Sequence, residues 1–469
     1  MTLAPGVGMA GSRGRKALAE IVNRAHAASV GKLRLLLFAF GDFAFNLYWQ
    51  SVMLFLLFYY TDALGLPMRI AATTFMLASI WDGVANFLAG IVADRRGSTR
   101  GYGMVLTLGS IPLGLTFALA YTPPPASGGW AIAFVFGSHL LFRTFYGLVN
   151  VPYLAMSSRI SIDSRDRAFV AGMRMLFGTS AAVVVALVTV PIGTWLTGSA
   201  VAADAYLGSA LLFALLGTAI LLIVGRSYRE GEAPPAHPPV SIGAALRSLA
   251  GNRAFVTLNL AMMAMIVAIT VLNKSILYYF KYYIGAENKA QLALASMSLV
   301  SAIAVPAWML LARAVGLRSL WFLAASLAVA GLAMFAALDI HGAGAMQIYL
   351  IGMQVAIVGL NFAFWAMLPN TIEYGERTTG LRVEGTVFGL AALLQRIAIG
   401  LATAILGWSF ESAGYVANEA QATSTLAAMR WTIALVPLGF LIVSCALMAF
   451  NPLTRGAHAR IVRALEDER

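Results

Sequence analysis

Six charged side chains fall inside stretches of the sequence that are otherwise strongly apolar. A charge in such a setting is costly unless it faces a partner or a water-filled cavity, so it marks a functional site by default. Carboxylates can hold a proton or a cation, whereas guanidinium groups present a fork of donors to hydroxyls or carboxylates. The six residues are Asp42, Asp82, Arg143, Arg174, Lys274 and Arg396.

Several of these residues also have a purely structural interpretation. Asp42 can accept hydrogen bonds from a hydroxyl-bearing molecule or form an ion pair with an arginine such as Arg174, and the two roles are compatible. Asp82 can carry a cation or simply neutralise a buried arginine. For Arg143, a role in helix packing or in snorkelling toward the membrane surface is as well supported as a functional one.

The composition places these residues in a membrane protein. Hydrophobic residues make up 60% of the chain and charged residues 11%, whereas a soluble domain carries about 25% charge. The apolar blocks are long enough to cross a hydrocarbon core of roughly 30 Å, and they must be helical because lipid offers the backbone no partners. Twelve spans are predicted, at 34–61, 69–93, 104–122, 130–155, 168–194, 203–224, 254–280, 291–312, 317–338, 345–368, 385–410 and 428–450.

The same composition argues against an enzyme and against an ATP-driven pump. The sole cysteine, Cys445, lies inside an apolar block and indicates neither a disulfide framework nor a metal site. We find no zinc-ligand spacing and no phosphate-binding glycine loop of the Walker type. No cofactor is expected, and Na⁺ at Asp82 is the one weak metal possibility.

The net charge of +12 reflects membrane topology and does not indicate a nucleic-acid partner. Of the 32 Lys and Arg residues, 24 fall at or outside the span ends on the side of the two termini, and four lie on the opposite side. The positive-inside rule therefore predicts that both termini are cytoplasmic. We expect a bacterial inner-membrane protein that is a monomer.

The longest polar interruption divides the predicted spans into six and six. It covers residues 225–253, and its Pro-rich centre at 232–239 is typical of a linker. The predicted domains are a cytoplasmic tail at 1–33, an N-terminal bundle at 34–224, the central loop at 225–253, a C-terminal bundle at 254–450 and a cytoplasmic tail at 451–469. An amphipathic helix near 16–27 is a less favoured alternative to a poorly ordered tail.

The two halves resemble each other in sequence. The first span ends Phe-Tyr-Tyr-Thr-Asp-Ala-Leu-Gly at 58–65, and the seventh ends Tyr-Tyr-Phe-Lys-Tyr-Tyr-Ile-Gly at 278–285. A second pair, Ala-Asp-Arg-Arg-Gly at 93–97 and Ala-Arg-Ala-Val-Gly at 312–316, keeps nearly the same offset. Two parallel six-helix repeats with a site between them are typical of the major facilitator fold. The segment at 90–97 is itself similar to that superfamily's loop signature, in which Asp94 and Arg95 are predicted gate residues.

Motifs from residue 33 to about 418 resemble the glycoside–pentoside–hexuronide:cation symporter family, the melibiose-carrier branch of that superfamily. They occur in the first, second and fourth spans and around the loop after the tenth. Besides the segment at 58–65, they are Gly-Asp-Phe-Ala at 41–44, Ile-Trp-Asp at 80–82, Asn-Val-Pro-Tyr at 150–153, Arg-Asp-Arg at 165–167, Trp-Ala-Met-Leu-Pro-Asn-Thr-Ile-Glu-Tyr-Gly-Glu at 365–376 and Thr-Gly-Leu-Arg-Val-Glu-Gly at 379–385. Arg396 stands where the melibiose carriers have a buried lysine.

The resemblance implies cation-coupled transport of a polar solute by alternating access. It also implies that Asp82 is the coupling carboxylate. Where sodium-using relatives have two further carboxylates, this chain has Asn86 and Asn150. Hard cations prefer several charged oxygen ligands, so we expect proton coupling, with sodium-coupled sugar symport as an alternative.

Departures from the family pattern bear on the solute. Asn150 and Leu154 replace an aspartate and a tryptophan that bind galactosides in the melibiose-type carriers, which weakens a galactoside assignment. Lys274 and Arg143 replace small residues there. Four cations against two anions within the spans favour an anionic solute such as a hexuronide, provided that the charges share one cavity.

Predicted solute-binding residues are drawn from six of the spans. They are Asp42, Asn150, Arg174, Lys274, Trp365 and Arg396, while Asp82, Asn86 and Asn150 are predicted to couple the cation. Glu373, Arg382 and Glu384 are predicted to lock the cytoplasmic gate together with Asp94 and Arg95. A lysolipid transporter of the same fold is the main alternative, because buried cations also suit a phosphate headgroup, and a scaffold or membrane enzyme would have no need of paired charges within the membrane.

Overall fold

The computed structural model describes residues 9–95, 101–125, 127–157, 160, 164–199, 201–228, 241–381, 383–454, 456–457, 460–461 and 463. For residues 9–30, 89–95, 164–165 and 167–168 it describes the backbone alone. Helices dominate this part of the chain and no strand occurs in it. The all-α fold predicted from the apolar blocks is therefore confirmed.

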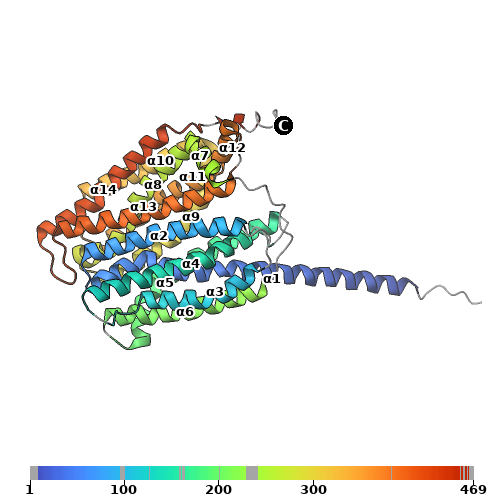
Figure 1. The fold of residues 1–469 in the computed structure, drawn as a ribbon, viewed down its shortest axis with the longest axis horizontal. Helices are drawn as coiled ribbons and strands as arrows, with labels where there is room; N and C mark the ends of the chain where they lie inside the picture. Colours follow the sequence, from blue (N-terminus) through green and yellow to red (C-terminus); the bar gives the residue numbers. More distant parts are fainter. Residues whose placement is uncertain are drawn as a thin grey trace, which may run out of the picture.

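Twelve long helices fill the described chain, one for each predicted span (Figure 1). In the first half they are α1 (Met9–Phe58), α2 (Met68–Arg95), α3 (Tyr102–Ala120), α4 (Gly129–Ser157), α5 (Ser164–Thr197) and α6 (Ala202–Ser227). In the second half they are α8 (Arg253–Tyr278), α9 (Glu287–Val315), α10 (Leu317–Ala337), α11 (Ala343–Met367), α13 (Glu384–Ser412) and α14 (Thr423–Ala449).

Eleven of these helices have the length and hydropathy of a membrane span over their described residues. The twelfth, α2, is missing from that set, yet it packs against α4 and α13 inside the bundle. Its described part carries Arg69 and Asp82 among apolar residues. The helix thus occupies the place of the predicted second span.

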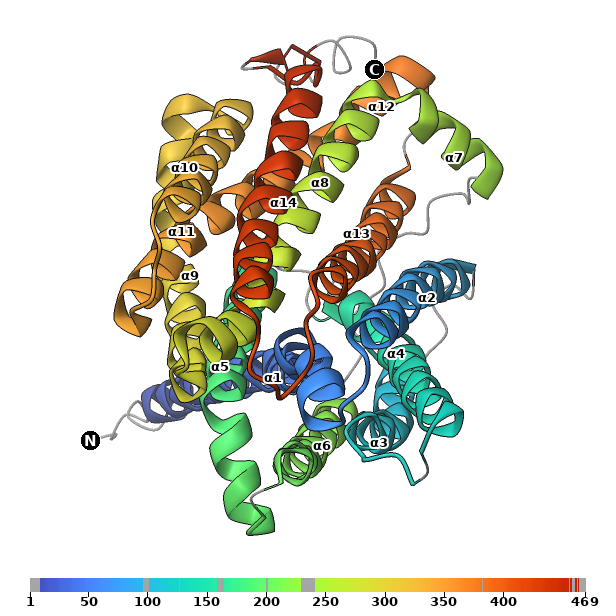
Figure 2. The ribbon, with the colours of Figure 1, turned by 90° about the vertical axis from the view of Figure 1, so that its left-hand side faces the viewer.

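The helices form two bundles with the same internal pairing. In the first, α1 packs on α5 and α6, and α3 on α4 and α6; in the second, α8 packs on α13 and α14, and α10 on α11 and α14. The bundles meet through two equivalent pairs, α2 with α13 and α5 with α9, which Figure 2 shows side by side. This arrangement confirms the repeat that the sequence echoes predicted.

Glycines on α13 allow its close approach to α2. A Cβ at Gly407 would lie 2.2 Å from the Cβ of Ala72, and one at Gly400 would lie 2.9 Å from the carbonyl oxygen of Met76. Small residues let helix backbones approach closely within a membrane. The contact between the halves is therefore tight along this pair of helices.

Both first helices of the repeats end in a π-helical turn, η1 (Tyr59–Ala63) after α1 and η2 (Tyr279–Ile284) after α8. These turns lie in the two segments whose sequences echo each other. A π-turn inserts an extra residue into a helix and frequently marks a functional site. We call the end of the bundle that carries these turns the Asp62 end.

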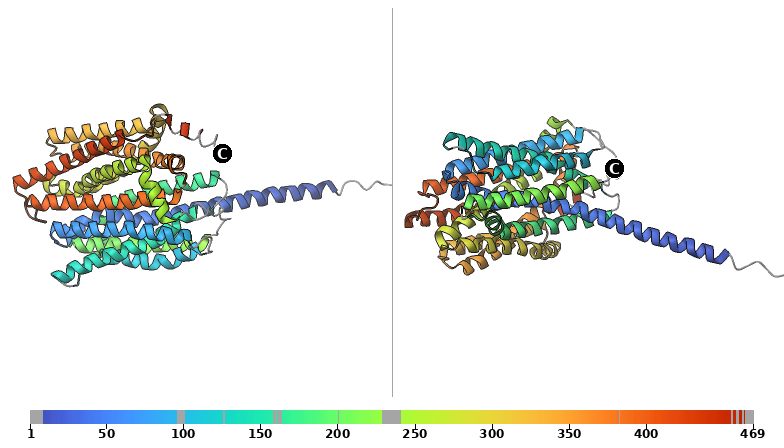
Figure 3. Two further views of the ribbon diagram at one scale, coloured as in Figure 1. Left: turned by 45° about the horizontal axis from the view of Figure 1, so that its top comes forward. Right: turned by 90° about the horizontal axis from the view of Figure 1, so that it is seen from below.

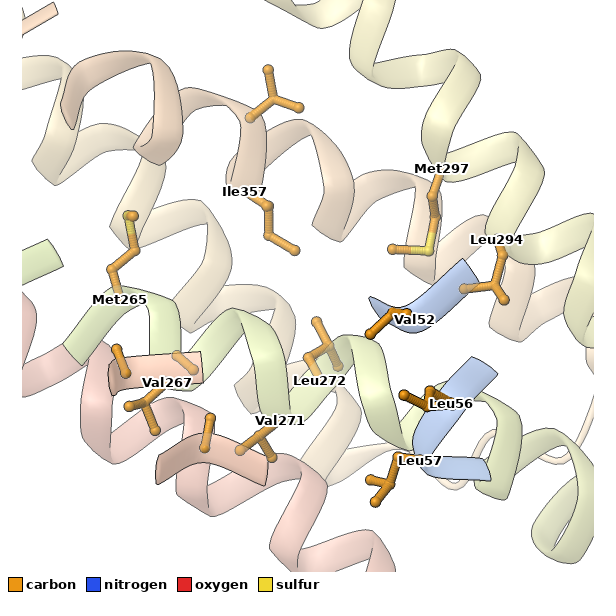
Figure 4. Close-up of a cluster of buried hydrophobic side chains, with 14 of the residues drawn as sticks. Val52, Leu56, Leu57, Met265, Val267, Val271, Leu272, Leu294, Met297 and Ile357 are labelled. Atoms are coloured by element: carbon orange, nitrogen blue, oxygen red, sulfur yellow. The ribbon is translucent and has the colours of Figure 1, made fainter. Parts of the chain in front are cut away.

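Apolar side chains fill the space between the two halves near this end. Val52, Leu56 and Leu57 of α1 lie beside Leu272 of α8 in Figure 4, and all four are at most 3% exposed. The packing follows from the apolar face of each helix, since a group without polar atoms loses nothing by leaving water.

Three elements differ from the sequence expectations. The central loop contains a helix, α7 (Ile242–Gly251), which Ser241 caps by accepting a hydrogen bond from the backbone of Ala244. The segment after the tenth span forms α12 (Asn370–Thr379). At the start of the chain, α1 begins at Met9 and projects from the bundle (Figures 1 and 3), where a poorly ordered tail was favoured.

Candidate functional site

A cavity of about 420 Å³ lies between the two bundles. Its walls come from α1 and α5 on one side and from α8, α9 and α11 on the other. Small-molecule sites commonly measure about 300–1,000 Å³, so this one suits a single small solute. Its polar lining residues are Asp42, Asn46, Gln50, Arg174, Thr179, Asn273, Ser298, Ser301 and Gln354.

The two charges at the cavity form an ion pair. Arg174 Nη2 donates to Asp42 Oδ1 at 3.1 Å, and each side chain is 18% exposed. The Arg174 guanidinium also lies 5.2 Å from the ring centre of Tyr153. Partial exposure lets an incoming molecule compete for both members of the pair, as a solute-binding role requires.

A stripe of polar residues on α1 leads away from Asp42. Asn46 donates to the Asp42 carbonyl at 2.9 Å, and Gln50 donates to Asn46 at 3.4 Å. Residues four apart lie on one face of a helix, so the spacing 42, 46, 50 directs all three side chains to one side. Asn46 and Gln50 are not among the site residues predicted from the sequence, although this spacing could have identified them.

The opposite wall carries only neutral polar and apolar groups among the described lining residues. Gln354 of α11 donates to the hydroxyl of Ser301 on α9 at 2.8 Å, and Asn273 of α8 joins them at the cavity. These residues have no charge to draw attention to them in a sequence. Their role depends on the packing of the second bundle against the first.

Asp82 lies outside this cavity, at the centre of a buried cluster. Its Oδ2 atom is 3.3 Å from Arg143 Nη1 and 3.1 Å from Arg396 Nε, and Asn86 donates to its Oδ1 at 2.9 Å. Asp82 and Arg143 are fully buried, whereas Arg396 is 22% exposed. Because Arg396 belongs to α13 and the others to α2 and α4, this cluster joins the two bundles.

Aromatic and imidazole groups complete what we call the Asp82 cluster. Trp49 lies under both guanidinium groups, 4.9 Å from that of Arg143 and 3.8 Å from that of Arg396. Arg143 Nε donates to His139 Nε2 at 3.1 Å, so the neutral imidazole carries its proton on Nδ1. His139 is also absent from the site residues predicted from the sequence, and its spacing of four from Arg143 could have identified it.

Lys274 occupies a separate buried position between the bundles. Its Nζ donates to the Met53 carbonyl of α1 at 3.2 Å and lies 3.7 Å above the ring centre of Phe75. The neighbouring Asn273 lines the cavity, and Lys274 does not. Only one of the four predicted cations, Arg174, therefore reaches the cavity, so these charges do not share one site.

The remaining predicted residues lie away from the cavity. Asn150 is half-buried on α4, and Trp365 is 46% exposed on α11 against Phe364. Among the predicted gate residues, Glu373 lies on α12 and Glu384 begins α13. The side chains of Asp94 and Arg95 and the whole of Arg382 lie outside the described residues.

Comparison with known proteins agrees with this architecture. The profile of the family described as "MFS/sugar transport protein" matches residues 37–455, which covers the first predicted span from residue 37 and the other eleven in full. The chain belongs to this family. The match confirms the relationship that the motifs predicted, and it identifies the protein as a multi-pass membrane transporter and not an enzyme.

Relatives in the MFS/sugar transport family match over most of their length. The chain is 26% identical to "Uncharacterized symporter YnaJ" of Bacillus subtilis over 92% of this chain and 94% of that protein. It is 25% identical to "Glucuronide carrier protein homolog" of Escherichia coli, with 92% and 95% covered. It is also 25% identical to "Isoprimeverose transporter" of Lactiplantibacillus pentosus, with 88% and 87% covered.

A solved structure confirms the fold independently. The nucleoside transporter NupG superposes with a TM-score of 0.64 at 16% identity, covering 90% of this chain and 99% of that one. At this identity the likeness concerns the fold alone. The family membership and the two-bundle structure together make the chain a secondary transporter.

Proposed function

We propose that the chain is a proton-coupled symporter of a glycoside, and that a hexuronide is its preferred solute. The observation that carries this proposal is the charge-paired cavity between the two bundles. Nine of its fifteen lining residues are polar, a lining that suits hydroxyl-bearing solutes better than an acyl chain. The polar lining therefore favours a glycoside over a lysolipid.

Asp42 and Arg174 are the proposed primary solute contacts. A sugar ring offers hydroxyls that can donate to the Asp42 carboxylate and accept from the Arg174 guanidinium, whose planar fork also suits a carboxylate. When the solute binds, its groups take the place of Arg174 as the partner of Asp42, and the place of Asp42 as the partner of Arg174. Solute contacts of Asn150, Lys274, Trp365 and Arg396 stay predictions, since these residues lie outside the cavity lining.

The preference for an anionic solute rests on the charge surrounding the cavity. The cavity itself is neutral, with one carboxylate and one guanidinium among its lining residues. Arg143, Arg396 and Lys274, against Asp82, lie outside the lining and leave an excess of positive charge around the cavity that acts on it only at a distance. Charges buried in a medium of low dielectric constant act over longer distances than charges in water. An anion at Arg174 gains from this field, and the name of one relative, a glucuronide carrier homolog, agrees with that chemistry.

Coupling is assigned to Asp82 because of its place between the bundles. With all groups ionised, Asp82, Arg143 and Arg396 carry a net charge of +1. A proton on Asp82 removes the attraction that holds Arg396 of α13 to α2, so proton binding weakens the contact between the halves. Sodium would have to displace two guanidinium groups from the same carboxylate, which makes the proton the better coupling ion.

The topology is part of the same proposal. The bias of Lys and Arg supports a cytoplasmic position for both termini, and in this orientation the Asp62 end faces the outside. Asp94, Arg95, Glu373, Arg382 and Glu384 would lie at the cytoplasmic gate. We further propose a monomer in the inner membrane of a bacterium.

Uptake into proteoliposomes tests the solute and the ion together. Labelled glucuronide and a neutral glycoside with the same aglycone are supplied with an inward proton gradient, an inward sodium gradient or neither. We expect accumulation of the glucuronide with the proton gradient, and its loss when a protonophore is added.

Three outcomes would contradict the proposal in separate ways. Preference for the neutral glycoside would overturn the anion argument while leaving sugar transport intact. Accumulation that needs sodium and resists the protonophore would reassign the coupling ion. Competition by a lysolipid, with no competition by any sugar, would show that the solute is a lysolipid and not a glycoside.

A further inference from the structure

The cavity is closed toward the Asp62 end. Leu54 is the last residue of α1 that lines it, and the next turn of α1 packs the buried side chains of Leu56, Leu57 and Phe58 between the bundles. A secondary transporter must expose its site to each side in turn. The contacts between the bundles at this end must therefore break during transport.

Those contacts converge on one carboxylate. Asp62 belongs to η1 of the first bundle, and its side chain is 2% exposed. Lys281 donates to its Oδ1 at 2.7 Å, Tyr415 donates to its Oδ2 at 2.9 Å, and Tyr282 also donates to Oδ1. All three donors come from the second bundle.

The connection between α13 and α14 adds a strained residue to this junction. Asn418 has a φ of 62°, the only positive φ of a non-glycine residue in the described chain. Its amide donates to the Asp62 carbonyl at 2.9 Å, its backbone N–H donates to Tyr282 at 2.8 Å, and its Oδ1 accepts from Lys281 at 2.7 Å. A strained backbone persists only where its surroundings hold it, and such sites cluster at switches and clamps.

The two π-turns position the partners of this junction. Asp62 lies in η1, and Lys281 and Tyr282 lie in η2. Thr61 of η1 and Tyr278, the last residue of α8, add a hydrogen bond of 2.9 Å between the two bundles. The turns occupy equivalent places in the two repeats, so one repeat supplies the acceptor and the other supplies the donors.

We propose that Asp62, Lys281, Tyr282, Tyr415 and Asn418 form a latch that closes the cavity at the Asp62 end. The connection at 413–422 belongs to the second bundle and contacts the first bundle at this end, where it helps to hold the two together. For this end of the cavity to open, all of these donors must separate from one buried carboxylate. The closed state is therefore released in a single cooperative step. The latch acts on access to the cavity and does not contact solute.

Distances between spin labels across the junction test the latch. The chain without its native thiol (Cys445→Ala) carries labels at Ser127→Cys and Asn288→Cys, which are exposed positions at this end of the first and second bundles. Double electron–electron resonance then reports the ratio of open to closed populations in lipid nanodiscs. We expect Asp62→Asn to raise this ratio by about tenfold or more, since it removes a charge-assisted set of hydrogen bonds.

A second carboxylate, the half-exposed Asp339, provides the control. Asp339 lies near the same end and accepts from Tyr283, pairs with His341 at 3.0 Å and lies 3.9 Å from Arg430, all within the second bundle. Asp339→Asn therefore leaves the distances unchanged. Asn418→Gly keeps the backbone angle accessible while removing the amide, and it shifts the ratio in the same direction as Asp62→Asn.

The latch is wrong if Asp62→Asn and Asn418→Gly both give the wild-type distances, or if Asp339→Asn shifts them equally. Gel filtration shows which variants are folded. If Asp62→Asn fails to fold, Tyr415→Phe carries the test, because it removes one hydroxyl donor and little volume. An unchanged distribution in a folded Tyr415→Phe variant would then overturn the proposal.

Discussion

The central cavity and the Asp82 cluster each hold a carboxylate paired with arginine, but they differ in access and in what they connect. The Asp42–Arg174 pair lies within the first bundle and is open to the cavity. Asp82 is sealed from solvent and pairs with an arginine from each bundle. The first arrangement suits exchange of partners with a solute, and the second suits a link that holds or releases the bundles.

The difference shows why buried charges of the same type need not share a role. An ion pair that a solute can reach has a third partner available, so breaking it costs little once the solute is bound. A sealed pair has no such replacement, and removing one member leaves an uncompensated charge in a medium of low dielectric constant. Access therefore separates solute binding from coupling more clearly than charge does.

Loss of the cavity arginine should have the largest effect. Arg174→Ala is expected to lower glucuronide uptake by about 100-fold, because the solute loses hydrogen bonds from a charged group, which are worth about 1.5–3 kcal/mol each. Initial rates in proteoliposomes measure this. Arg174→Lys keeps the charge but not the planar fork, so uptake that is equally low for Lys and Ala assigns the effect to geometry; wild-type uptake in Arg174→Ala would remove the pair from the solute site.

Asp82→Asn should separate coupling from binding. We expect the variant to exchange labelled for unlabelled solute across the membrane, yet to lose accumulation driven by a proton gradient, since the group that carries the proton is gone. Asp42→Asn, in contrast, is expected to impair both exchange and accumulation. If Asp82→Asn still accumulates solute against a gradient, the coupling group lies elsewhere and the division between the two regions fails.

The loss of stability should be larger for the change at Asp82 than for the change at Asp42, the reverse of the expected effects on solute binding. Asp82→Asn leaves two arginines without their carboxylate and is expected to cost about 3–5 kcal/mol, whereas Asp42→Asn, in a pair that solvent reaches, should cost about 1–2 kcal/mol. Thermal unfolding in detergent compares the two. The double variant Asp82→Asn with Arg143→Met should unfold at a higher temperature than Asp82→Asn alone; equal midpoints for the two Asp→Asn variants would contradict the difference in burial.

The fold and the cavity side of this comparison could be predicted from the sequence, but the partners within the Asp82 cluster could not. Twelve apolar blocks predict twelve helices because the membrane permits few alternatives, and an ion pair between Asp42 and an arginine such as Arg174 was one of two compatible interpretations of that carboxylate. The partners of Asp82 could not be assigned, since any of the buried cations can satisfy a carboxylate and only packing of α2 against α13 brings Arg396 to it.

Neutral residues were harder to predict than charged ones. A charge in an apolar block stands out, but Asn46, Gln50 and Gln354 are marked only by where their helices face. The spacing of four from Asp42 could have identified the first two, since it places them on one helix face. Nothing local identifies Gln354, because its place at the cavity depends on how the second bundle packs on the first.

The uncharged wall of the cavity should give the smallest effect and the finest test. Gln354→Leu removes the hydrogen bond to Ser301 and one polar group at the cavity, so we expect the apparent KM for glucuronide to rise about 3–10-fold, as for loss of a neutral hydrogen bond. Gln347 is a matched control on the same helix, since it donates to Ser296 at 3.3 Å away from the cavity lining. Gln347→Leu should leave the apparent KM unchanged. Equal effects of the two variants would show that these residues act through packing of α11 on α9, and the solute contacts would then belong to the first bundle alone.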